Sequence, residues 1–385
     1  MKHKRLLLII SFALTLILPL ITSLIKWNGF PPGYGLFPAQ KVMNDPSFSL
    51  VYFIIACVIA LFITLFLLFP RLFGFKKYNP DTPTPPKVSY PFWFYPSLVV
   101  MLISWFLMWA RIEVLYPIEE FTFVPLWWGF ILVLDGIVYK RNGGVSLVSS
   151  KPMTMKLLAV TSAFSWFVFE YLNFFVIENW YYPNDKVFSN FGNIAWQLIS
   201  YTTVLPAIFE WYSLLKTFKK LNNYYKKGIT ISFSRTFYWI ILITGFILLL
   251  LMGYFPFLLF WVLWMGLIPV LGGAMSIGKF WNPFTPISEK GDWSFIILMA
   301  LSSLINGFIW EFWNFGSEWF HDYAPTNPNY WKYSIPYLDV IHLFSEMPLL
   351  GYFGYLFFGI IFWMMWLLIA YIIGFNPSIK LNNQN

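Results

Sequence analysis

The sequence predicts an all-α integral membrane protein with about ten transmembrane helices, and three observations predict this fold class. Hydrophobic residues make up 59% of the 385-residue chain and charged residues only 11%, which is outside the usual range of soluble globular proteins. Apolar runs of about 18–25 residues, the length that a helix needs to cross a bilayer, recur along the whole chain. Basic residues gather in every second segment between these runs.

Each apolar run is interpreted as one membrane-crossing helix. In chain order, the predicted helices span residues 6–25, 48–69, 93–110, 122–139, 157–177, 194–215, 236–254, 257–277, 293–315 and 348–375. The first run follows the basic segment Met1–Arg5, as the core of a signal peptide would. Because its apolar core is long and no small-residue cleavage site follows it, we expect an uncleaved first helix.

The basic residues predict the orientation of the helices. If the N-terminus lies in the cytoplasm and the helices alternate in direction, most of the 25 Lys and Arg residues fall in cytoplasmic segments, above all in loop 216–235. Both termini are then cytoplasmic. This arrangement explains the net charge of +8 without nucleic acid, and membrane lipids are the expected partners. The expected location is the bacterial cytoplasmic (inner) membrane, which the chain crosses many times.

Four pairs of similar segments lie about 140 residues apart in the chain. The first pair is a Glu with an Asn three residues later, inside an apolar run in both places. The pairs are Glu170–Asn173 with Glu311–Asn314, 127–136 with 264–273, Glu178–Trp180 with Glu318–Trp319, and Val204–Ile208 with Glu346–Leu350. These matches predict an internal duplication.

The duplication predicts the domain organisation. In chain order, we expect a two-helix leader hairpin (1–77), a Pro-rich cytoplasmic linker (78–91), a four-helix repeat (92–220), a basic cytoplasmic loop (221–235) and a second four-helix repeat (236–385) with an outer interfacial segment (334–347). Because each repeat has an even number of helices, the two run in the same direction and their pseudo-twofold axis lies along the membrane normal. The two Glu–Asn pairs are then at equal depth, towards the outer leaflet.

The duplicated pairs supply the candidate catalytic residues Glu170, Glu311, Asn173 and Asn314. Residues three apart share one face of a helix, so each amide could orient its carboxyl group. An apolar site favours the protonated form of a carboxyl group, which a general acid needs. The alternative is structural: Glu and Asn hydrogen-bond across the interface of the two copies and lock the halves together. The sequence supports both interpretations.

Aromatic residues near these pairs are candidates for substrate binding, because ring faces stabilise cations. With two polar residues of the outer segment, the candidates are Trp166, Trp310, Trp313, Trp180, Trp319, Glu346 and His342. Residues 342 and 346 are four apart, so on a helix they would form a His–carboxylate pair near the outer end. Glu318, His321 and Asp322 could ligate a metal ion, but such a loop is also typical of an interfacial aromatic belt, and no metal is predicted.

Several absences predict that the chain holds no cofactor. With only three His residues and the single Cys57, the sequence excludes bis-His haem ligation, His-box di-iron chemistry and iron–sulfur clusters. No Lys lies at the centre of a predicted helix, which disfavours a retinal Schiff base. The chain has no Walker A loop, no GxGxxG motif and no serine-nucleophile elbow.

Part of the chain resembles the small integral-membrane lycopene cyclase domain. The resemblance rests on an acidic helix residue (Glu170), an outer aromatic turn (Glu178–Tyr182) and a helix with Pro206 four residues before Glu210, and it covers at most 194–216 and the Glu170 helix. That family's Pro-Leu-Glu-Glu motif reads Pro-Ala-Ile-Phe-Glu here, and the predicted units have four helices rather than three. The chain also resembles uncharacterised bacterial polytopic membrane proteins that carry a Trp-Glu-x-Trp-Asn helix, as at Trp310–Asn314.

Three functions are compatible with these residues. The first is binding or transformation of a lipid or isoprenoid by acid chemistry near the outer leaflet, which predicts a lipid-accessible cavity and a hydrophobic small molecule as partner. The second is proton- or cation-coupled transport, which predicts a water-accessible path from the two glutamates to Asp135 or Glu210. The third is a non-catalytic scaffold or complex subunit. The aromatic excess favours the first, but the sequence does not establish that the chain is an enzyme.

Overall fold

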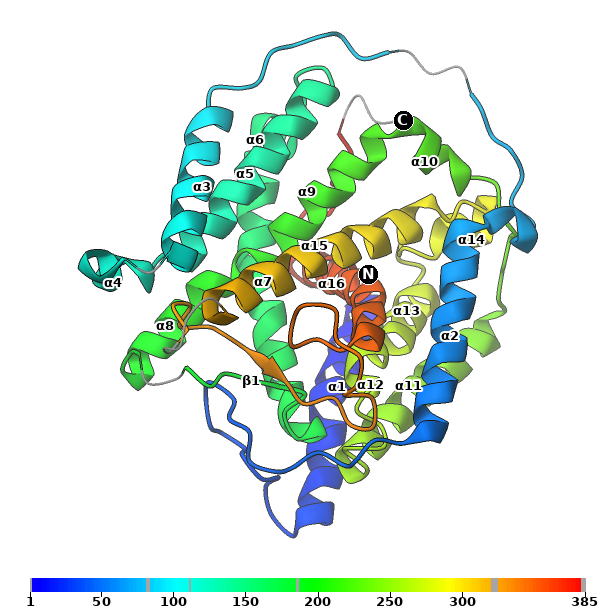
Figure 1. Cartoon of the computed structure of the whole chain (residues 1–385). Coiled ribbons are helices and arrows are strands. Elements are labelled where there is room, and N and C mark those ends of the chain that lie inside the picture. Colours follow the sequence, from blue (N-terminus) through cyan, green and yellow to red (C-terminus); the bar gives the residue numbers. More distant parts are fainter. Residues whose placement is uncertain (1, 81–83, 111, 185–186, 320–324, 382–385) are drawn as a thin grey trace.

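The computed structural model describes residues 2–80, 84–110, 112–184, 187–319 and 325–381. Within these ranges the chain is mostly helical, and its one small sheet consists of β1 (Trp180–Tyr181) and β2 (Lys332–Tyr333) (Figure 1). The predicted helical class is therefore confirmed.

Long helices occupy most of the predicted apolar runs. They are α1 (Lys2–Trp27), α2 (Leu50–Leu68), α3 (Phe94–Ala110), α5 (Phe123–Arg141), α7 (Pro152–Asn173), α11 (Arg235–Tyr254), α15 (Ser294–Trp319) and α16 (Tyr352–Ile373). Of the helical segments in the described residues, seven are long and apolar enough to cross a membrane: Lys2–Trp27, Leu50–Leu68, Phe123–Arg141, Pro152–Val176, Arg235–Tyr254, Ser294–Glu318 and Leu349–Ile373. By length and composition these helices fit a membrane protein, whereas the count of ten crossings stays a prediction.

Two predicted helices are each broken into two pieces. Run 194–215 forms α8 (Asn190–Tyr201) and α9 (Val204–Thr217), and run 257–277 forms α12 (Val262–Met265) and α13 (Leu267–Ile277). In each case a Pro follows shortly after the break, Pro206 in α9 and Pro269 in α13. Proline has no N–H to donate to the preceding turn, so the first turn of a helix is where it fits best.

Short elements connect the long helices. The α-helical ones are α4 (Tyr116–Glu119), α6 (Leu147–Ser150), α10 (Lys219–Tyr224) and α14 (Thr285–Lys290), and the 3₁₀ turns are η1 (Pro70–Phe73), η2 (Glu113–Leu115), η3 (Phe174–Val176) and η4 (Leu349–Gly351). The described residues 84–93 of the Pro-rich segment lead into α3 at one end of the molecule (Figure 1). At the opposite end, β1 and β2 pair antiparallel, with Trp180 opposite Tyr333.

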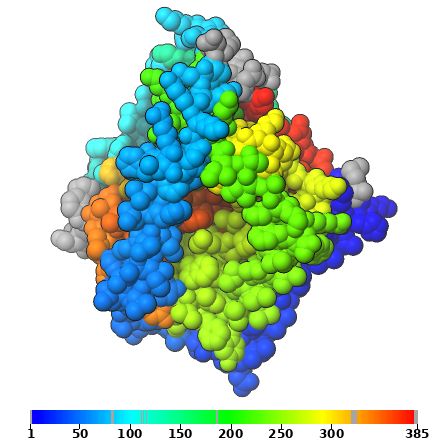
Figure 2. All heavy atoms as spheres, turned by 90° about the vertical axis from the view of Figure 1, so that its right-hand side faces the viewer, coloured from blue at the N-terminus to red at the C-terminus, as the bar shows by residue number. Residues whose placement is uncertain are grey.

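Helix α2 stands at the edge of the helical assembly. Within it only Ala60 is buried, and apolar side chains such as Val58 and Leu61 are more than half exposed. The space-filling view shows a hollow between α2 (blue) and the segment around α11–α13 (yellow-green), with atoms of the C-terminal part at its base (Figure 2). The edge position of α2 therefore leaves an opening in the side of the molecule.

Candidate functional site

Glu170 lies in α7 and is buried, with 3% of the residue exposed. Its Oε1 atom accepts four hydrogen bonds, from Trp166 Nε1 at 2.9 Å, Trp180 Nε1 at 3.0 Å, the Tyr182 hydroxyl at 2.5 Å and the Tyr201 hydroxyl at 2.9 Å. These donors come from α7 itself, from β1 and the residue after it, and from α8. One carboxyl oxygen thus joins three segments of the chain.

Glu311 in α15 has a similar environment and is fully buried. Its Oε1 atom accepts hydrogen bonds from the hydroxyls of Tyr333 at 2.7 Å and Tyr355 at 2.6 Å. Trp331 Nε1 in turn donates to the Tyr333 hydroxyl at 2.8 Å. The two tyrosine hydroxyls lie 3.1 Å apart here, and the corresponding pair at Glu170 lies 3.3 Å apart. Both glutamates therefore bond to a pair of touching tyrosines.

The two asparagines bond to the loop that follows their own helix. Asn173 Nδ2 donates to the Trp180 carbonyl at 2.9 Å, and its Oδ1 accepts from the Asn179 N–H at 2.8 Å. Asn314 Nδ2 donates to the Trp331 carbonyl at 2.8 Å, and its Oδ1 accepts from the same residue's N–H at 3.2 Å. Each amide fixes the backbone that carries the aromatic donors to the glutamate.

These bonds differ from both roles expected for the amides. Asn173 does not hydrogen-bond to Glu170 in the described residues, and Asn314 does not bond to Glu311. Nor does either amide bond to the glutamate of the other half. The sequence correctly places Glu and Asn on one helix face. The amide, however, bonds to the backbone that follows the helix, and this bond positions the tyrosine and tryptophan donors.

The second oxygen of each glutamate has no hydrogen-bond partner among the described residues. Burial favours the neutral form of a carboxyl group. The hydrogen bonds donated to Oε1 stabilise the ionised form instead. Burial and hydrogen bonding therefore act in opposite directions on the protonation of both carboxyl groups.

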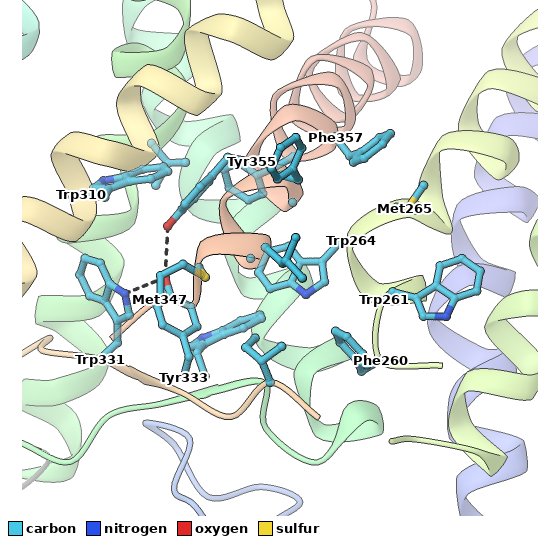
Figure 3. Close-up of a pocket in the computed structure, with 18 of the residues that line it drawn as sticks. Phe260, Trp261, Trp264, Met265, Trp310, Trp331, Tyr333, Met347, Tyr355 and Phe357 are labelled. Atoms are coloured by element: carbon cyan, nitrogen blue, oxygen red, sulfur yellow. Dashed lines mark hydrogen bonds between the residues drawn. The ribbon is translucent and has the colours of Figure 1, made fainter. Parts of the chain in front are cut away.

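The side chains that surround both glutamates line a single cavity of about 230 Å³ (Figure 3). The residues shared by the cavity wall and the hydrogen-bond networks are Trp166, Trp180, Tyr182, Tyr201, Trp331, Tyr333 and Tyr355. Neither glutamate belongs to the wall itself. The aromatic side chains therefore separate the two carboxyl groups from the cavity.

The cavity reaches α2 on one side and α12 on another. Ala56, Ile59 and Ile63 of α2 contribute to its wall, together with Trp261 and Trp264 at α12. This wall corresponds to the hollow beside α2 in the space-filling view (Figure 2). The cavity is consequently open towards the side of the helical assembly, where apolar side chains are exposed.

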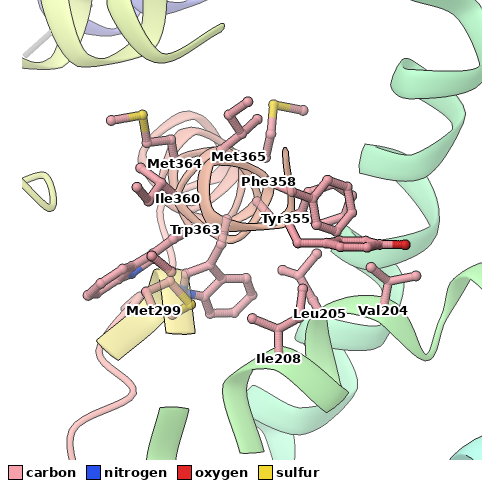
Figure 4. Close-up of a cluster of buried hydrophobic side chains, with 14 of the residues drawn as sticks. Val204, Leu205, Ile208, Met299, Tyr355, Phe358, Ile360, Trp363, Met364 and Met365 are labelled. Atoms are coloured by element: carbon pink, nitrogen blue, oxygen red, sulfur yellow. The ribbon is translucent and has the colours of Figure 1, made fainter. Parts of the chain in front are cut away.

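Helix α16 forms the base of the cavity and the centre of the core. Tyr355 and Phe358 face the cavity, and the helix packs along α15 (Figure 4). Further along, the Trp363 ring packs against Phe209 and Tyr212 of α9. At the α15–α16 contact, a Cβ on Gly359 would lie 2.6 Å from Ser303 Cβ. Glycine is needed there for the close approach of the two helices. This packing fixes Tyr355 relative to Glu311.

Of the predicted substrate-binding residues, Trp166, Trp180 and Trp310 line the cavity. Trp313 does not, because its ring packs against Trp127, with centroids 4.8 Å apart. Trp166 and Trp310 precede the two glutamates on their helices, and their ring centroids lie 6.4 Å apart. The two halves of the site therefore touch through these rings.

The expected pair of His342 and Glu346 does not form. Segment 334–347 is irregular rather than helical, and His342 instead lies 3.0 Å from the Asp339 carboxylate. Glu346 and Glu318 both lie near Lys332 Nζ, at 3.6 Å and 3.3 Å. Burial acts to lower the pKa of Lys332, but these carboxylates outweigh it and raise the pKa above its ordinary value. These groups form an ion-pair cluster outside the cavity wall.

The metal site that Glu318, His321 and Asp322 could form is only partly within the described residues. His321 and Asp322 lie outside them, as does the side chain of Trp319. Among the residues that are described, no group of three or more His, Cys, Asp or Glu residues could hold a metal ion.

Sequence reasoning missed the tyrosines that contact the glutamates. A short repeated motif could have found two of them, since Trp180-x-Tyr182 recurs as Trp331-x-Tyr333. The recurrence is difficult to recognise because the Asn and the Trp are 7 residues apart in the sequence of the first half and 17 residues apart in the second. The contacts thus match Trp180 with Trp331, not with Trp319 as the sequence comparison had it.

The tyrosine contacts also change the match predicted further along the chain. Tyr201 at the end of α8 and Tyr355 in α16 occupy equivalent positions beside the two glutamates. In these contacts Tyr355 corresponds to Tyr201, whereas the sequence comparison matches Val204–Ile208 with Glu346–Leu350. An irregular segment lies between β2 and η4.

A second acidic pair is buried between α5 and α9. Asp135 accepts hydrogen bonds from Trp93 Nε1 at 3.2 Å, Ser146 Oγ at 2.8 Å and the Val148 N–H at 2.9 Å. Glu210 of α9 is fully buried near Asp135, and neither of its carboxyl oxygens has a hydrogen-bond partner among the described residues. Two buried carboxylates so placed repel each other, which favours the neutral form of at least one of them. Neither residue belongs to the cavity wall.

Glu178 is a third buried acid, in the loop between η3 and β1. It is 1% exposed, and neither carboxyl oxygen has a hydrogen-bond partner among the described residues. Its backbone and that of Ile177 are left-handed, with φ of 50° and 55°. Burial raises the pKa of Glu178 to about 8. The packing of the surrounding loops therefore keeps this carboxyl group away from water, although its charged form is more stable in water.

Comparison with protein-family models, curated proteins and solved structures gives no match to this chain.

Proposed function

We propose that this chain binds a lipid or isoprenoid molecule in the aromatic cavity and supports acid chemistry on it. The observation that carries the proposal is that the hydrogen-bond partners of Glu170 and Glu311 line one cavity. Ligand sites are mostly apolar and contain a few convergent polar groups. A single apolar cavity beside two buried carboxyl groups fits this description.

The opening beside α2 supports a ligand that arrives from the bilayer. Every apolar side chain of α2 except Ala60 is exposed or partly exposed, and four residues of this helix also line the cavity. In a membrane such a face is in contact with lipid. An apolar molecule could then move from the bilayer into the cavity without crossing water.

The tyrosines supply a route for a proton between a glutamate and the ligand. In the proposed step the protonated glutamate carries its proton on Oε1, the atom that the Tyr hydroxyls contact. A Tyr hydroxyl gives its own proton to a carbon–carbon double bond of the ligand and takes the proton of Oε1 in its place. The carbocation formed would be stabilised by the tryptophan faces of the wall. Loss of a proton from the cation to the second, ionised glutamate through its own tyrosine pair completes an isomerisation or cyclisation. No oxidant or reductant is needed.

The proposal includes an internal duplication with parallel halves, as the sequence predicts. It is supported by the matched contacts of Glu170 with Glu311, of Asn173 with Asn314, and of their tyrosine pairs. Location in a bacterial inner membrane with cytoplasmic termini, and the resemblance to the lycopene cyclase domain, stay predictions of the sequence.

Proton- or cation-coupled transport is the second candidate, and the buried pair of Asp135 and Glu210 favours it. A proton shared by these acids could exchange with Glu170, because α9 packs against both α5 and α7. The two candidates differ in what they need. Transport requires an aqueous path between the acid sites, whereas the first candidate requires a bound apolar molecule.

The deciding experiment is organic extraction of the detergent-purified chain, followed by absorbance and mass spectrometry. We expect a stoichiometric isoprenoid or unusual lipid, or its altered form, that changes in the Glu170→Gln, Glu311→Gln double variant. Glu346→Gln is the matched control, because that acid lies outside the cavity wall. Only bulk phospholipid, unchanged by the double substitution, would contradict the proposal. In that case proton flux into liposomes that depends on Asp135 would support transport instead.

A further inference from the structure

The cavity wall contains a patch of neutral polar side chains at one place. Gln197 and Ser200 of α8 and Thr203 at the α8–α9 break belong to it, together with Asn329 from the segment before β2. Asn329 Nδ2 donates to Ser200 Oγ at 2.6 Å, and Thr203 Oγ1 donates to the Ser200 carbonyl at 2.7 Å. Three of the four residues are therefore connected by hydrogen bonds, and they come from two parts of the chain.

Gln197 is the residue of this patch that lacks partners. It is fully buried, and neither its Nε2 nor its Oε1 has a hydrogen-bond partner among the described residues. A buried amide without partners is destabilising, and native proteins contain few of them. Since Gln197 also lines the cavity, a ligand in the cavity can supply the missing donor and acceptor.

The polar patch is uncharged, and so is the rest of the wall. The described residues that line the cavity include no Lys, Arg or His. A phosphate or carboxylate group buried here would have no cation to pair with, which is costly in an apolar site. The wall therefore suits a neutral oxygen group, which can accept from and donate to an amide.

We propose that Gln197, with Ser200 and Asn329, binds a hydroxyl or carbonyl group of an otherwise apolar ligand. This inference rests on the proposed function and narrows its substrate class to neutral oxygenated isoprenoids or lipids, as distinct from diphosphates and plain hydrocarbons. The subsite also sets the ligand's position. Tyr201 is four residues after Gln197, hence on the same face of α8, and it donates to Glu170 at 2.9 Å. The polar group is held about one helical turn from the Glu170 centre.

The test is equilibrium binding of three probes to the full-length chain in nanodiscs, read by quenching of tryptophan fluorescence. The probes are geranylgeraniol, the hydrocarbon of the same skeleton without the hydroxyl group, and geranylgeranyl diphosphate. We expect the alcohol to bind about tenfold more tightly than either of the others. Gln197→Met, which keeps the shape of the side chain but not its hydrogen bonds, should abolish the preference for the alcohol over the hydrocarbon.

Thr64→Val on α2 is the matched control, because it also removes a polar group but lies outside the cavity wall. If Gln197→Met fails to fold, Ser200→Ala tests the same patch with a smaller change. Equal binding of alcohol and hydrocarbon to the wild-type chain, or tightest binding of the diphosphate, would overturn the subsite and leave the proposed function standing. Binding of none of the three would count against both, and the extraction experiment then decides the proposed function separately.

Discussion

At the scale of single residues, the site depends on which atoms the polar side chains actually contact. Glu170 and Asn173 share a helix face, yet they serve different partners. The glutamate collects hydroxyl and indole donors, while the amide holds the backbone of Trp180, which is one of those donors. The asparagine is therefore a positioning residue. The motif of a Glu and an Asn three residues apart identifies the position of the site in the sequence. It does not show that the two side chains bind different partners.

The buried Glu178 should make the free energy of unfolding depend on pH. Its pKa in the folded chain is raised by burial to about 8, from an ordinary value of 4.5. As the pH rises above 4.5, the unfolded chain loses this proton while the folded chain keeps it. The contribution of Glu178 to the free energy of unfolding therefore falls until the pH reaches about 8, and then levels off.

Glu178→Gln should remove this contribution. We expect the variant to be more stable than the wild-type chain by about 1–3 kcal/mol at pH 8 and above, and the difference to shrink towards pH 5. Thermal unfolding in detergent at both pH values measures it. Glu289→Gln, at an exposed position, is the control. A gain in stability that does not depend on pH would show that titration of Glu178 is not its cause.

At the scale of elements, the break between α8 and α9 places Tyr201 beside Glu170. Ser162 of α7 bridges the break: its Oγ donates to the Tyr201 carbonyl at 2.5 Å and accepts from the Leu205 N–H at 2.9 Å. Backbone groups freed by a broken helix must find partners inside an apolar environment. One serine satisfies both groups here, and it ties α7 to the residue that contacts the glutamate.

Ser162→Ala should therefore destabilise the fold by about 1–3 kcal/mol, because two buried backbone groups lose their partner. Ser165→Ala is a strict control. Ser165 lies one turn later on the same helix and is equally buried, but its Oγ has no partner among the described residues. A shift of the unfolding transition in the first variant and none in the second would support the bridging role, whereas equal shifts would contradict it.

At the scale of the whole molecule, the sequence predicts the helical class and the positions of the apolar helices, because hydropathy and length depend only on local composition. It also locates both buried glutamates. It does not predict the breaks at α8–α9 and α12–α13, since the hydropathy of an apolar run is the same whether the run forms one continuous helix or two shorter ones. The partners of Glu311 are missed for another reason. They come from residues 333 and 355, beyond an irregular segment whose length differs from that in the first half.

The cavity is a property of the whole molecule, because several helices and loops form its wall. Gly354 in α16 lines the cavity, and a Cβ added there would meet no atom within 4 Å. Gly354→Leu should therefore place a side chain in the cavity without disturbing helix packing. Cys57→Leu on α2 enlarges a partly exposed side chain outside the cavity wall and is the matched control.

If the cavity holds the ligand, Gly354→Leu should lower the amount of extracted apolar molecule by about tenfold or more, with an unfolding temperature close to that of the wild-type chain. Cys57→Leu should leave the bound amount unchanged. This pair separates occupancy of the cavity from the acidity of the glutamates, because neither substitution alters a titratable group of the site. Full retention of the molecule in a folded Gly354→Leu variant would place the ligand elsewhere on the protein, and the two glutamates would then need a different explanation.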